Sequence, residues 1–167
     1  SRDNNNTSEG AAFIPSSSTV KPVYSLRQEL IDAFAMNDKR KDNWIKQQVV
    51  SGQPYYYPTK YKMRTSTPVS EYYVVMRLAE VYLIRAEARA RLQDISGSQN
   101  DLNIVRQRAG LGNTAASDEA TLLSAIANER RTELFMEWGQ RWTDLKRTQQ
   151  ADIVLGALNG TNWQSTD

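Results

Sequence analysis

The residues best suited to chemistry are charged side chains spaced one helical turn apart near the end of the chain. Glu129, Glu133 and Glu137 follow one another at i,i+4 spacing, and paired carboxylates supply the general acid and base of glycoside hydrolysis. The neighbouring arginines, however, hold such carboxylates ionised, which makes them poor general acids. The chain has no histidine to serve as a partner base or metal ligand. We therefore expect no catalytic residue, no metal site and no cofactor.

Arg130 falls on the apolar side of the same predicted helix. A buried guanidinium must be paired, because an isolated charge in a protein interior is costly, and Glu133 or Asp144 is the expected partner. One interpretation is an anion or substrate site. The alternative, which we favour, is a structural network that fixes how two helices dock, with Glu137 and Arg141 as a further i,i+4 pair. The residues of this predicted network are Arg130, Glu133, Glu137, Arg141 and Asp144.

Three consecutive tyrosines, flanked by prolines, form the most suggestive aromatic feature. Stiff aromatic rings held together make a flat apolar platform, which suits the faces of sugar rings or a protein partner. In the alternative interpretation, at least two of the rings pack onto the helices. The candidate ligand-binding residues are Trp44, Tyr55, Tyr56 and Tyr57.

Composition narrows the possible function classes. The chain has 167 residues, enough for one domain of ordinary size. Without cysteine it has no disulfide, thiolate nucleophile or cysteine-bound zinc. The net charge is +2, with acidic and basic residues interleaved, whereas nucleic-acid binding requires a surface of one sign. We therefore expect no nucleic-acid partner.

The elements that position these residues begin after an irregular, flexible segment, residues 1–24, which is rich in Asn and Ser. A capping pattern, Ser25 followed by Gln28, predicts a short helix over 25–36. Residues 44–64 are predicted as a β-excursion. This β-excursion contains the strands 44–50 and 59–64 on either side of the turn SGQP, and the three tyrosines lie at the exposed end of the predicted hairpin.

Two helix pairs are predicted next, over 72–109 and 117–149. Ala79, Ala86 and Ala90 on one face of the first helix allow close approach of a neighbour. Ser98 is expected to cap the second helix. Gly110 is expected to end this helix by adopting a left-handed backbone conformation. Ser117 is the expected cap of the third helix, which runs to residue 139 and has another helix after it. An irregular tail covers 150–167.

These elements predict a mainly α fold, built from tetratricopeptide-like antiparallel helix pairs with a small β-hairpin excursion. Residues 25–167 are expected to form part of a single domain.

Several segments, taken in order, resemble the SusD/RagB family, the surface nutrient-binding lipoproteins of Bacteroidetes. The similarity covers about residues 25–147, roughly the C-terminal third of a family member. Its segments are LRQELIDAFAMNDKRKDNW, PTKYKM, MRLAEVYLIRAEARARLQD, DLNIVRQRAGL and AIANERRTELFMEWGQRWTDLKR.

The resemblance implies a binding protein rather than an enzyme. Family members lie at the cell outer membrane, anchored by an N-terminal lipid that this chain would lack, and deliver glycans or oligosaccharides, or in some members peptides, to a SusC-like TonB-dependent transporter. Arg130, Glu133, Arg141 and Asp144 match scaffold positions, whereas glycan contacts in the family lie on variable loops. The alternative functions are a protein-interaction scaffold and a peptide-capturing family member.

Overall fold

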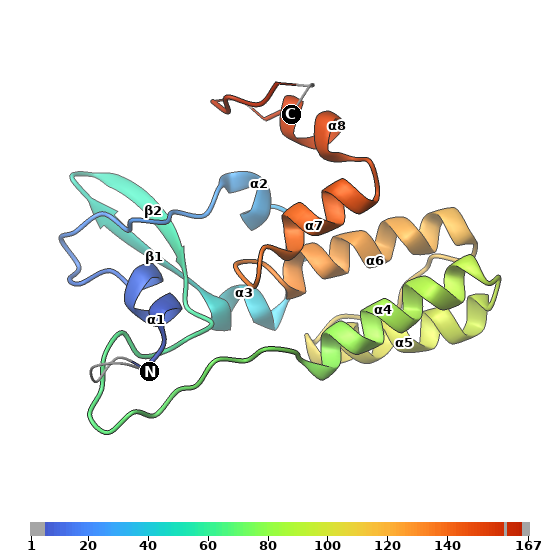
Figure 1. Ribbon diagram of the computed structural model, residues 1–167, viewed down its shortest axis with the longest axis horizontal. Coiled ribbons are helices and arrows are strands. Elements are labelled where there is room, and N and C mark those ends of the chain that lie inside the picture. The colour runs from blue at the N-terminus through green and yellow to red at the C-terminus, as the bar shows by residue number, and fades with distance from the viewer. Residues whose placement is uncertain (1–5, 159, 165–167) are drawn as a thin grey trace.

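The computed structural model describes residues 6–158 and 160–164 and is mainly helical, as predicted (Figure 1). Three long helices, α4 to α6, lie alongside one another, and a two-stranded hairpin with the short helices α1 to α3 lies at the other side of the molecule. No described helix has the length and apolar character needed to cross a membrane. The elements are α1 (Ser8–Phe13), α2 (Gln28–Ile31), α3 (Lys39–Trp44), β1 (Ile45–Val50), β2 (Gln53–Pro58), α4 (Leu78–Arg91), α5 (Ile95–Arg108), α6 (Glu119–Glu133), α7 (Gln140–Arg147) and α8 (Ala151–Gly156).

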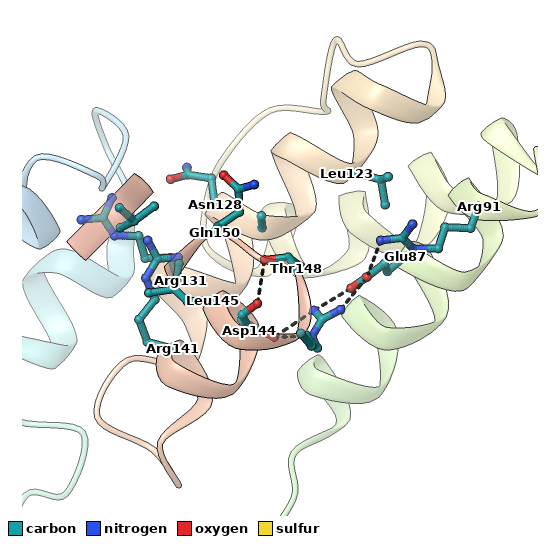
Figure 2. A pocket seen from close by; sticks show the side chains of 13 residues that line it. Glu87, Arg91, Leu123, Asn128, Arg131, Arg141, Asp144, Leu145, Thr148 and Gln150 are labelled. Carbon is teal, nitrogen blue, oxygen red and sulfur yellow. Dashed lines mark hydrogen bonds and ion pairs between the residues drawn. The ribbon is translucent and has the colours of Figure 1, made fainter. Parts of the chain in front are cut away.

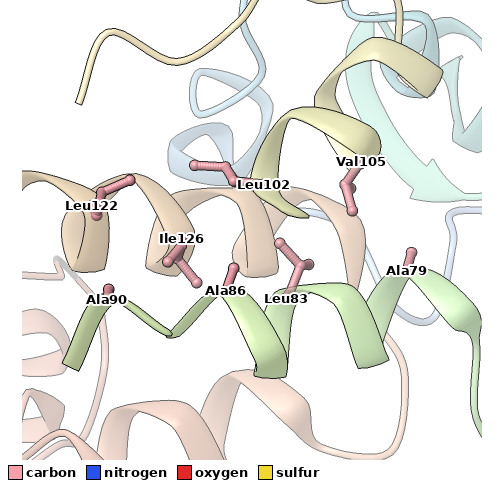
Figure 3. Packing of buried hydrophobic residues seen from close by; sticks show 8 residues of the cluster. All are labelled: Ala79, Leu83, Ala86, Ala90, Leu102, Val105, Leu122 and Ile126. Atoms are coloured by element: carbon pink, nitrogen blue, oxygen red, sulfur yellow. The ribbon is translucent and has the colours of Figure 1, made fainter. Parts of the chain in front are cut away.

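The main core lies between α4, α5 and α6. Its small residues on α4 allow the helices to pack closely, and Ala86 and Ala90 are fully buried. The Ser98 hydroxyl on α5 donates to the Ala86 carbonyl at 2.8 Å, which fixes the α4–α5 pair. Burying each large apolar side chain stabilises the fold by about 1.5–3 kcal/mol. Figure 3 shows the cluster, which comprises Ala79, Leu83, Ala86, Ala90, Leu102, Val105, Leu122 and Ile126.

A second apolar cluster joins the N-terminal half to the end of α6. Phe34 and Phe135 meet edge to face, with ring centroids 5.8 Å apart. Ile45 at the start of β1 completes the link between hairpin and helices. The buried members are Leu26, Ile31, Phe34, Ile45 and Phe135.

The hairpin differs from the predicted one in its second strand. β2 is the proline-flanked tyrosine segment itself, and residues 59–64 are not a strand. Ser51 and Gly52 both have positive φ, 52° and 78°, as a two-residue hairpin turn requires. Prolines are tolerated in β2 because a two-stranded sheet leaves outward-facing backbone groups unpaired. The sequence prediction was wrong because it treated all four residues of SGQP as the turn.

The first long helix begins at Leu78, and not at residue 72 as predicted. Val74 and Val75 are β-branched, which lowers their preference for helix. The Val74 carbonyl accepts a hydrogen bond from Trp138 Nε1 at 3.0 Å, and its backbone N–H donates to the Tyr61 hydroxyl at 3.3 Å. Tertiary hydrogen bonds thus hold residues 72–77 as extended chain.

Two predicted caps are each displaced to an aspartate. Asp94, not Ser98, caps α5 by accepting from the Gly97 backbone N–H at 2.9 Å. Asp118, not Ser117, caps α6 by accepting from the Thr121 backbone N–H at 2.9 Å, and Thr121 completes the capping box. The predicted role of Gly110 at the end of α5 is confirmed by its φ of 83°.

The third long helix ends at Glu133, six residues earlier than predicted. The Glu133 carbonyl accepts from Lys60 Nζ at 2.6 Å and from Arg77 Nη2 at 2.8 Å. These side chains take the place of the backbone N–H group that would donate to the Glu133 carbonyl if the helix continued. Met136 and Trp138 then adopt left-handed φ values of 57° and 43°, which complete the break.

Further differences concern the shorter elements. α2 covers only residues 28–31 of the predicted helix 25–36, because the Leu26 N–H donates to the Tyr56 carbonyl at 2.7 Å and keeps that stretch extended. α1 and α8 are helices within the segments 1–24 and 150–167, which were predicted to be irregular. Residues 1–5, 159 and 165–167 of those segments lie outside the described residues. The assignment of residues 25–167 to one domain stays a prediction.

Candidate functional site

The three tyrosines of β2 do not form one platform. Side chains alternate along a strand, so Tyr55 and Tyr57 share one face of the hairpin and Tyr56 lies on the other. Tyr56 packs against the second apolar cluster. Tyr55 and Tyr57 are half-buried, and Lys21 Nζ lies 4.9 Å from the centroid of the Tyr55 ring. Tyr55 and Tyr57, which share one face of the hairpin, are called the tyrosine pair.

Trp44, the fourth candidate, has a different environment. Its half-buried ring lies 4.7 Å from Lys60 Nζ and 5.7 Å from the guanidinium carbons of Arg77 and Arg108. Phe135 is its aromatic neighbour, at 6.4 Å between centroids. Among the described residues, no aromatic ring contact joins Trp44 to the tyrosine pair. The structure thus does not bring the four candidates together.

The centre of the charged residues is Glu133, whose side chain is fully buried at the end of α6. Its carboxylate accepts from Arg40 Nη1 at 3.0 Å and from Arg108 Nη2 at 2.6 Å, and it also binds Arg77. Burial opposes ionisation of Glu133, but the charges and hydrogen bonds of Arg77 and Arg108 outweigh it and hold its pKa below the ordinary value. Glu133 is thus ionised at neutral pH and cannot act as a general acid.

Glu129, one turn earlier on α6, is also buried and faces Arg40 and Arg106. Arg40 Nη1 lies 2.6 Å from Glu129 Oε1, and Arg106 Nη1 lies 3.3 Å from Oε2. Burial raises the pKa of Glu129, although both arginines act against this. Arg40 is itself oriented by Asp38, which accepts from Arg40 Nη2 at 2.7 Å. The resulting cluster of buried carboxylates and guanidinium groups is called the Glu133 network.

Glu137 extends this network into the loop after α6. It accepts from Lys60 Nζ at 2.6 Å and from Arg77 Nη2 at 3.1 Å. Burial lowers the pKa of Lys60 to about 8, although Glu137 acts against this. The predicted i,i+4 pair of Glu137 and Arg141 is absent, because Glu137 lies in the break between α6 and α7, whereas Arg141 lies on α7.

Arg130 is buried and donates from Nε to Asp144 Oδ2 at 2.8 Å, which ties α6 to α7. Arg147 bridges Asp144, at 2.8 Å, to Glu87 on α4, at 2.6 Å. These contacts link three helices by paired, hydrogen-bonded charges. They have the geometry that the sequence analysis expects of a helix-docking network, with Asp144 rather than Glu133 as the partner of Arg130.

Sequence reasoning missed the cations that bind Glu129, Glu133 and Glu137. Those that bind Glu133 come from loops and helices that lie 25 to 93 residues away from it, so no local spacing indicates them. The one local signal is Asp38, which precedes Arg40 by two residues and caps α3. The missed residues are Arg40, Lys60, Arg77, Arg106 and Arg108.

A cavity of about 260 Å³ opens between α4, α6, α7 and α8 (Figure 2). Its lining combines apolar side chains such as Leu123 and Leu145 with the arginines and carboxylates of the surrounding helices. In Figure 2, Arg131 and Arg141 lie together at one end of the cavity, and Leu123 and Arg91 lie at the other. Such a concave site, partly apolar and ringed by polar groups, suits a small polar ligand.

The described residues contain no group of three or more carboxylates, histidines or cysteines placed to hold a metal ion. The most buried carboxylates of α6 are bound to guanidinium groups. Taken together, the arrangement provides a rigid charged scaffold, an aromatic pair on the hairpin and one cavity with an excess of arginine.

Comparison with known proteins places these features in a family. The sequence profile of the SusD family matches residues 46–164. SusD-like protein P2 of Formosa agariphila is 35% identical over an alignment of 96 residues that covers 50% of this chain and 18% of that protein. A SusD homolog from Bacteroides thetaiotaomicron has a similar structure, with a TM-score of 0.69 and 29% identity, covering 85% of this chain and 34% of that chain.

Surface glycan-binding protein A from Bacteroides uniformis is also similar, with a TM-score of 0.61 and 26% identity, over 80% of this chain and 31% of that chain. The chain thus spans 18% of the length of the Formosa relative and about a third of the length of these two structures. The profile match extends over most of the chain. This chain belongs to the SusD family.

Proposed function

We propose that this chain is part of a non-catalytic nutrient-binding protein of the bacterial cell surface, which binds a glycan or oligosaccharide. The observation that carries the proposal is the SusD-family match over residues 46–164. The similarity to surface glycan-binding protein A supports a glycan as the ligand. Because arginines hold the buried Glu133 ionised, this carboxylate favours a scaffold over a catalytic centre.

The family resemblance further motivates a location and a partner for the whole protein. We propose that it is held at the outer membrane by an N-terminal lipid and delivers its ligand to a SusC-like TonB-dependent transporter. In this proposal Arg130, Glu133, Glu137 and Asp144 fix the helices and make no ligand contact. Arg141 is not part of the paired network, because none of the described residues forms an ion pair with it.

Within the described residues, we propose the tyrosine pair as a glycan contact. Tyr55 and Tyr57 are half-buried, so their orientation is fixed while ring surface remains accessible. Aromatic faces bind sugar rings through their apolar C–H groups. Tyr56 and Trp44 serve the core instead, since Tyr56 packs in the second apolar cluster and Trp44 lies beneath three cations.

The proposal is tested by affinity electrophoresis and calorimetry of the chain against a panel of plant, host and microbial polysaccharides. We expect at least one glycan to bind, and the double variant Tyr55→Ala/Tyr57→Ala to weaken that binding at least tenfold. The matched control is Tyr72→Ala, which removes a tyrosine that is 76% exposed and lies outside the hairpin.

Undiminished binding by the double variant would remove the tyrosine pair from the proposal. If no glycan bound, the glycan function of this chain would be rejected and the peptide-capturing alternative would be preferred.

A second candidate function, a protein-interaction scaffold, is favoured by one specific feature. The extended segment before α4 and the first residue of α4 expose large apolar side chains, and we call these residues the apolar ribbon. Contiguous exposed apolar surface usually marks an interaction site, and a transporter is the partner that the family resemblance suggests. The ribbon comprises Tyr72, Val75, Met76 and Leu78, which are 65–76% exposed.

A further inference from the structure

The cavity between α4, α6, α7 and α8 has more positive than negative charge. Four arginines line it, against two carboxylates. The two carboxylates, Glu87 and Asp144, are already bound, because Arg147 contacts both of them and Arg130 holds Asp144. Arg91 also pairs with Glu87, at 3.5 Å. The remaining arginines of the lining, Arg131 and Arg141, are therefore in excess.

Arg131 and Arg141 are both half-buried. Arg131 Nη2 donates to the backbone carbonyl of Glu29 at 2.7 Å, but none of the described residues forms an ion pair with Arg131. None of the described residues forms either an ion pair or a hydrogen bond with the Arg141 side chain. A half-buried guanidinium without a carboxylate loses hydration and gains no counter-charge. An anion between the two arginines would supply that charge.

The electrostatics at this end of the cavity agree with the geometry. Burial lowers the pKa of Arg141, and the positive charge of Arg131 lowers it further, while Asp144 acts in the opposite direction. Burial likewise lowers the pKa of Arg131, with Glu29 opposing. Two cations that repel each other in a partly desolvated site form a favourable place for a negatively charged ligand.

The rest of the lining suits a sugar ring. Leu123 and Val154 present apolar surface, which matches the C–H face of a pyranose. The side-chain amides of Asn128 and Gln150 line the cavity without a hydrogen-bond partner among the described residues, so they are available to sugar hydroxyls. The volume of about 260 Å³ lies just below the range of about 300–1,000 Å³ that drug-sized ligands occupy, which suits one sugar unit.

We propose that this cavity binds the carboxylate-bearing sugar unit of an acidic glycan, a uronic acid, with Arg131 and Arg141 holding its carboxylate. Arginine matches a carboxylate with two parallel N–H donors, which orients the ligand as well as attracting it. This inference rests on the proposed glycan-binding function and names the class of sugar. It places a site on the helices, separate from the tyrosine pair on the hairpin.

Calorimetry with trigalacturonate and trimannuronate, each compared with its methyl ester, tests the proposal. The ester keeps the sugar rings and removes the negative charge, with one methyl group added at each carboxyl. We expect at least one free acid to bind at least tenfold more tightly than its ester, and Arg141→Gln to abolish that difference. The control Lys41→Gln removes an equal charge from an exposed position on α3 and should change affinity less than twofold.

The outcomes separate this inference from the proposed function. If neutral polysaccharides bind but neither acid binds better than its ester, the uronic-acid site is rejected and the glycan-binding function stands. If an acid binds but Arg141→Gln leaves its affinity unchanged, the site lies elsewhere and the inference is overturned. If no glycan of either kind binds, both proposals fail. Thermal unfolding without ligand provides a further readout, because a merely structural Arg141 would lower the melting temperature on substitution and leave affinity unaltered.

Discussion

At the scale of single residues, Glu133 shows how a buried charge is made tolerable. Its carboxylate has no exposure to solvent and contacts three arginines from different parts of the chain. Such a group gives little net stability compared with an apolar residue, but removing its charge takes one counter-charge from all three arginines, of which Arg40 and Arg77 are the more buried. The energetic consequence of changing Glu133 therefore comes mainly from the arginines around it.

The first prediction concerns this carboxylate. Glu133→Gln keeps the shape of the side chain and removes its charge, and we expect the free energy of unfolding to fall by about 3–5 kcal/mol. Urea denaturation measures the change. The control is Arg91→Gln, which removes a 55% exposed guanidinium 3.5 Å from Glu87 and should change the unfolding free energy by less than about 1 kcal/mol. A loss below 1 kcal/mol for Glu133→Gln would show that the network tolerates a missing charge.

Lys60 provides a pH-dependent prediction. Its pKa in the folded chain is about 8, against an ordinary value of 10.5, so between these values the unfolded chain holds a proton that the folded chain has released. Stability from this group therefore rises with pH across that window, and below pH 8 the cost of burying the charge is fully present. Relative to Lys60→Met, the native chain should gain about 2 kcal/mol of unfolding free energy from pH 7.5 to 9.5.

Urea denaturation of both proteins at several pH values measures this gain. The Lys60→Met variant serves as the reference, since other titrating groups affect both proteins alike. A constant difference between the two across the window would mean that Lys60 keeps its proton in the folded state.

At the scale of elements, the sequence predicted the buried face of a helix more accurately than the first and last residues of that helix. The apolar spacing of Ala79, Ala86 and Ala90 predicted a close helix pair, because one face of a helix is a local property. The boundaries were set by partners elsewhere in the chain. α6 ends at Glu133 because the carbonyl of this residue accepts hydrogen bonds from Lys60 and Arg77. α2 begins later than predicted because the Leu26 N–H donates to a carbonyl of β2. No local pattern contains such information.

The cap of α6 offers a prediction at this scale. Asp118 accepts from the Thr121 backbone N–H, whereas the neighbouring Ser117 was the cap expected from the sequence. Asp118→Ala should lower the melting temperature by roughly 2–4 °C, because a helix without its cap leaves orphan N–H groups. Ser117→Ala should leave the melting temperature unchanged. Thermal unfolding followed by circular dichroism measures both melting temperatures. A larger loss for Ser117→Ala than for Asp118→Ala would show that Ser117 is the cap.

At the scale of the whole molecule, an apolar helical core lies beside apolar surface that none of the described residues covers. The apolar ribbon continues into α4, whose Val81 and Ile84 are also substantially exposed. Polar contacts hold this stretch in place, since Trp138 and Tyr61 bind the backbone of Val74, which lies next to Val75 of the ribbon. The sequence indicated Tyr55, Tyr56 and Tyr57 as the exposed aromatic feature. It predicted the ribbon as part of a helix and did not indicate that the ribbon is exposed.

This exposure predicts self-association. We expect the chain to associate reversibly as its concentration rises, and the variant Val75→Ser/Met76→Ser to remain monomeric in sedimentation velocity experiments. Val23→Ser/Met36→Ser is the matched control, because it removes two equally exposed apolar side chains outside the ribbon and should associate as the native chain does. Equal association of both variants would show that the ribbon is not the contact surface.

The Glu133 network also restricts how this sequence can change over generations. Arg40, Arg77 and Arg108 come from separate stretches of the chain and meet only at Glu133. Replacing Glu133 alone removes the one carboxylate that all three arginines share, so an inherited change at Glu133 is expected to require further changes among its partners. In lineages descended from a common ancestor, these positions should therefore vary together, while an exposed neighbour such as Lys41 drifts independently.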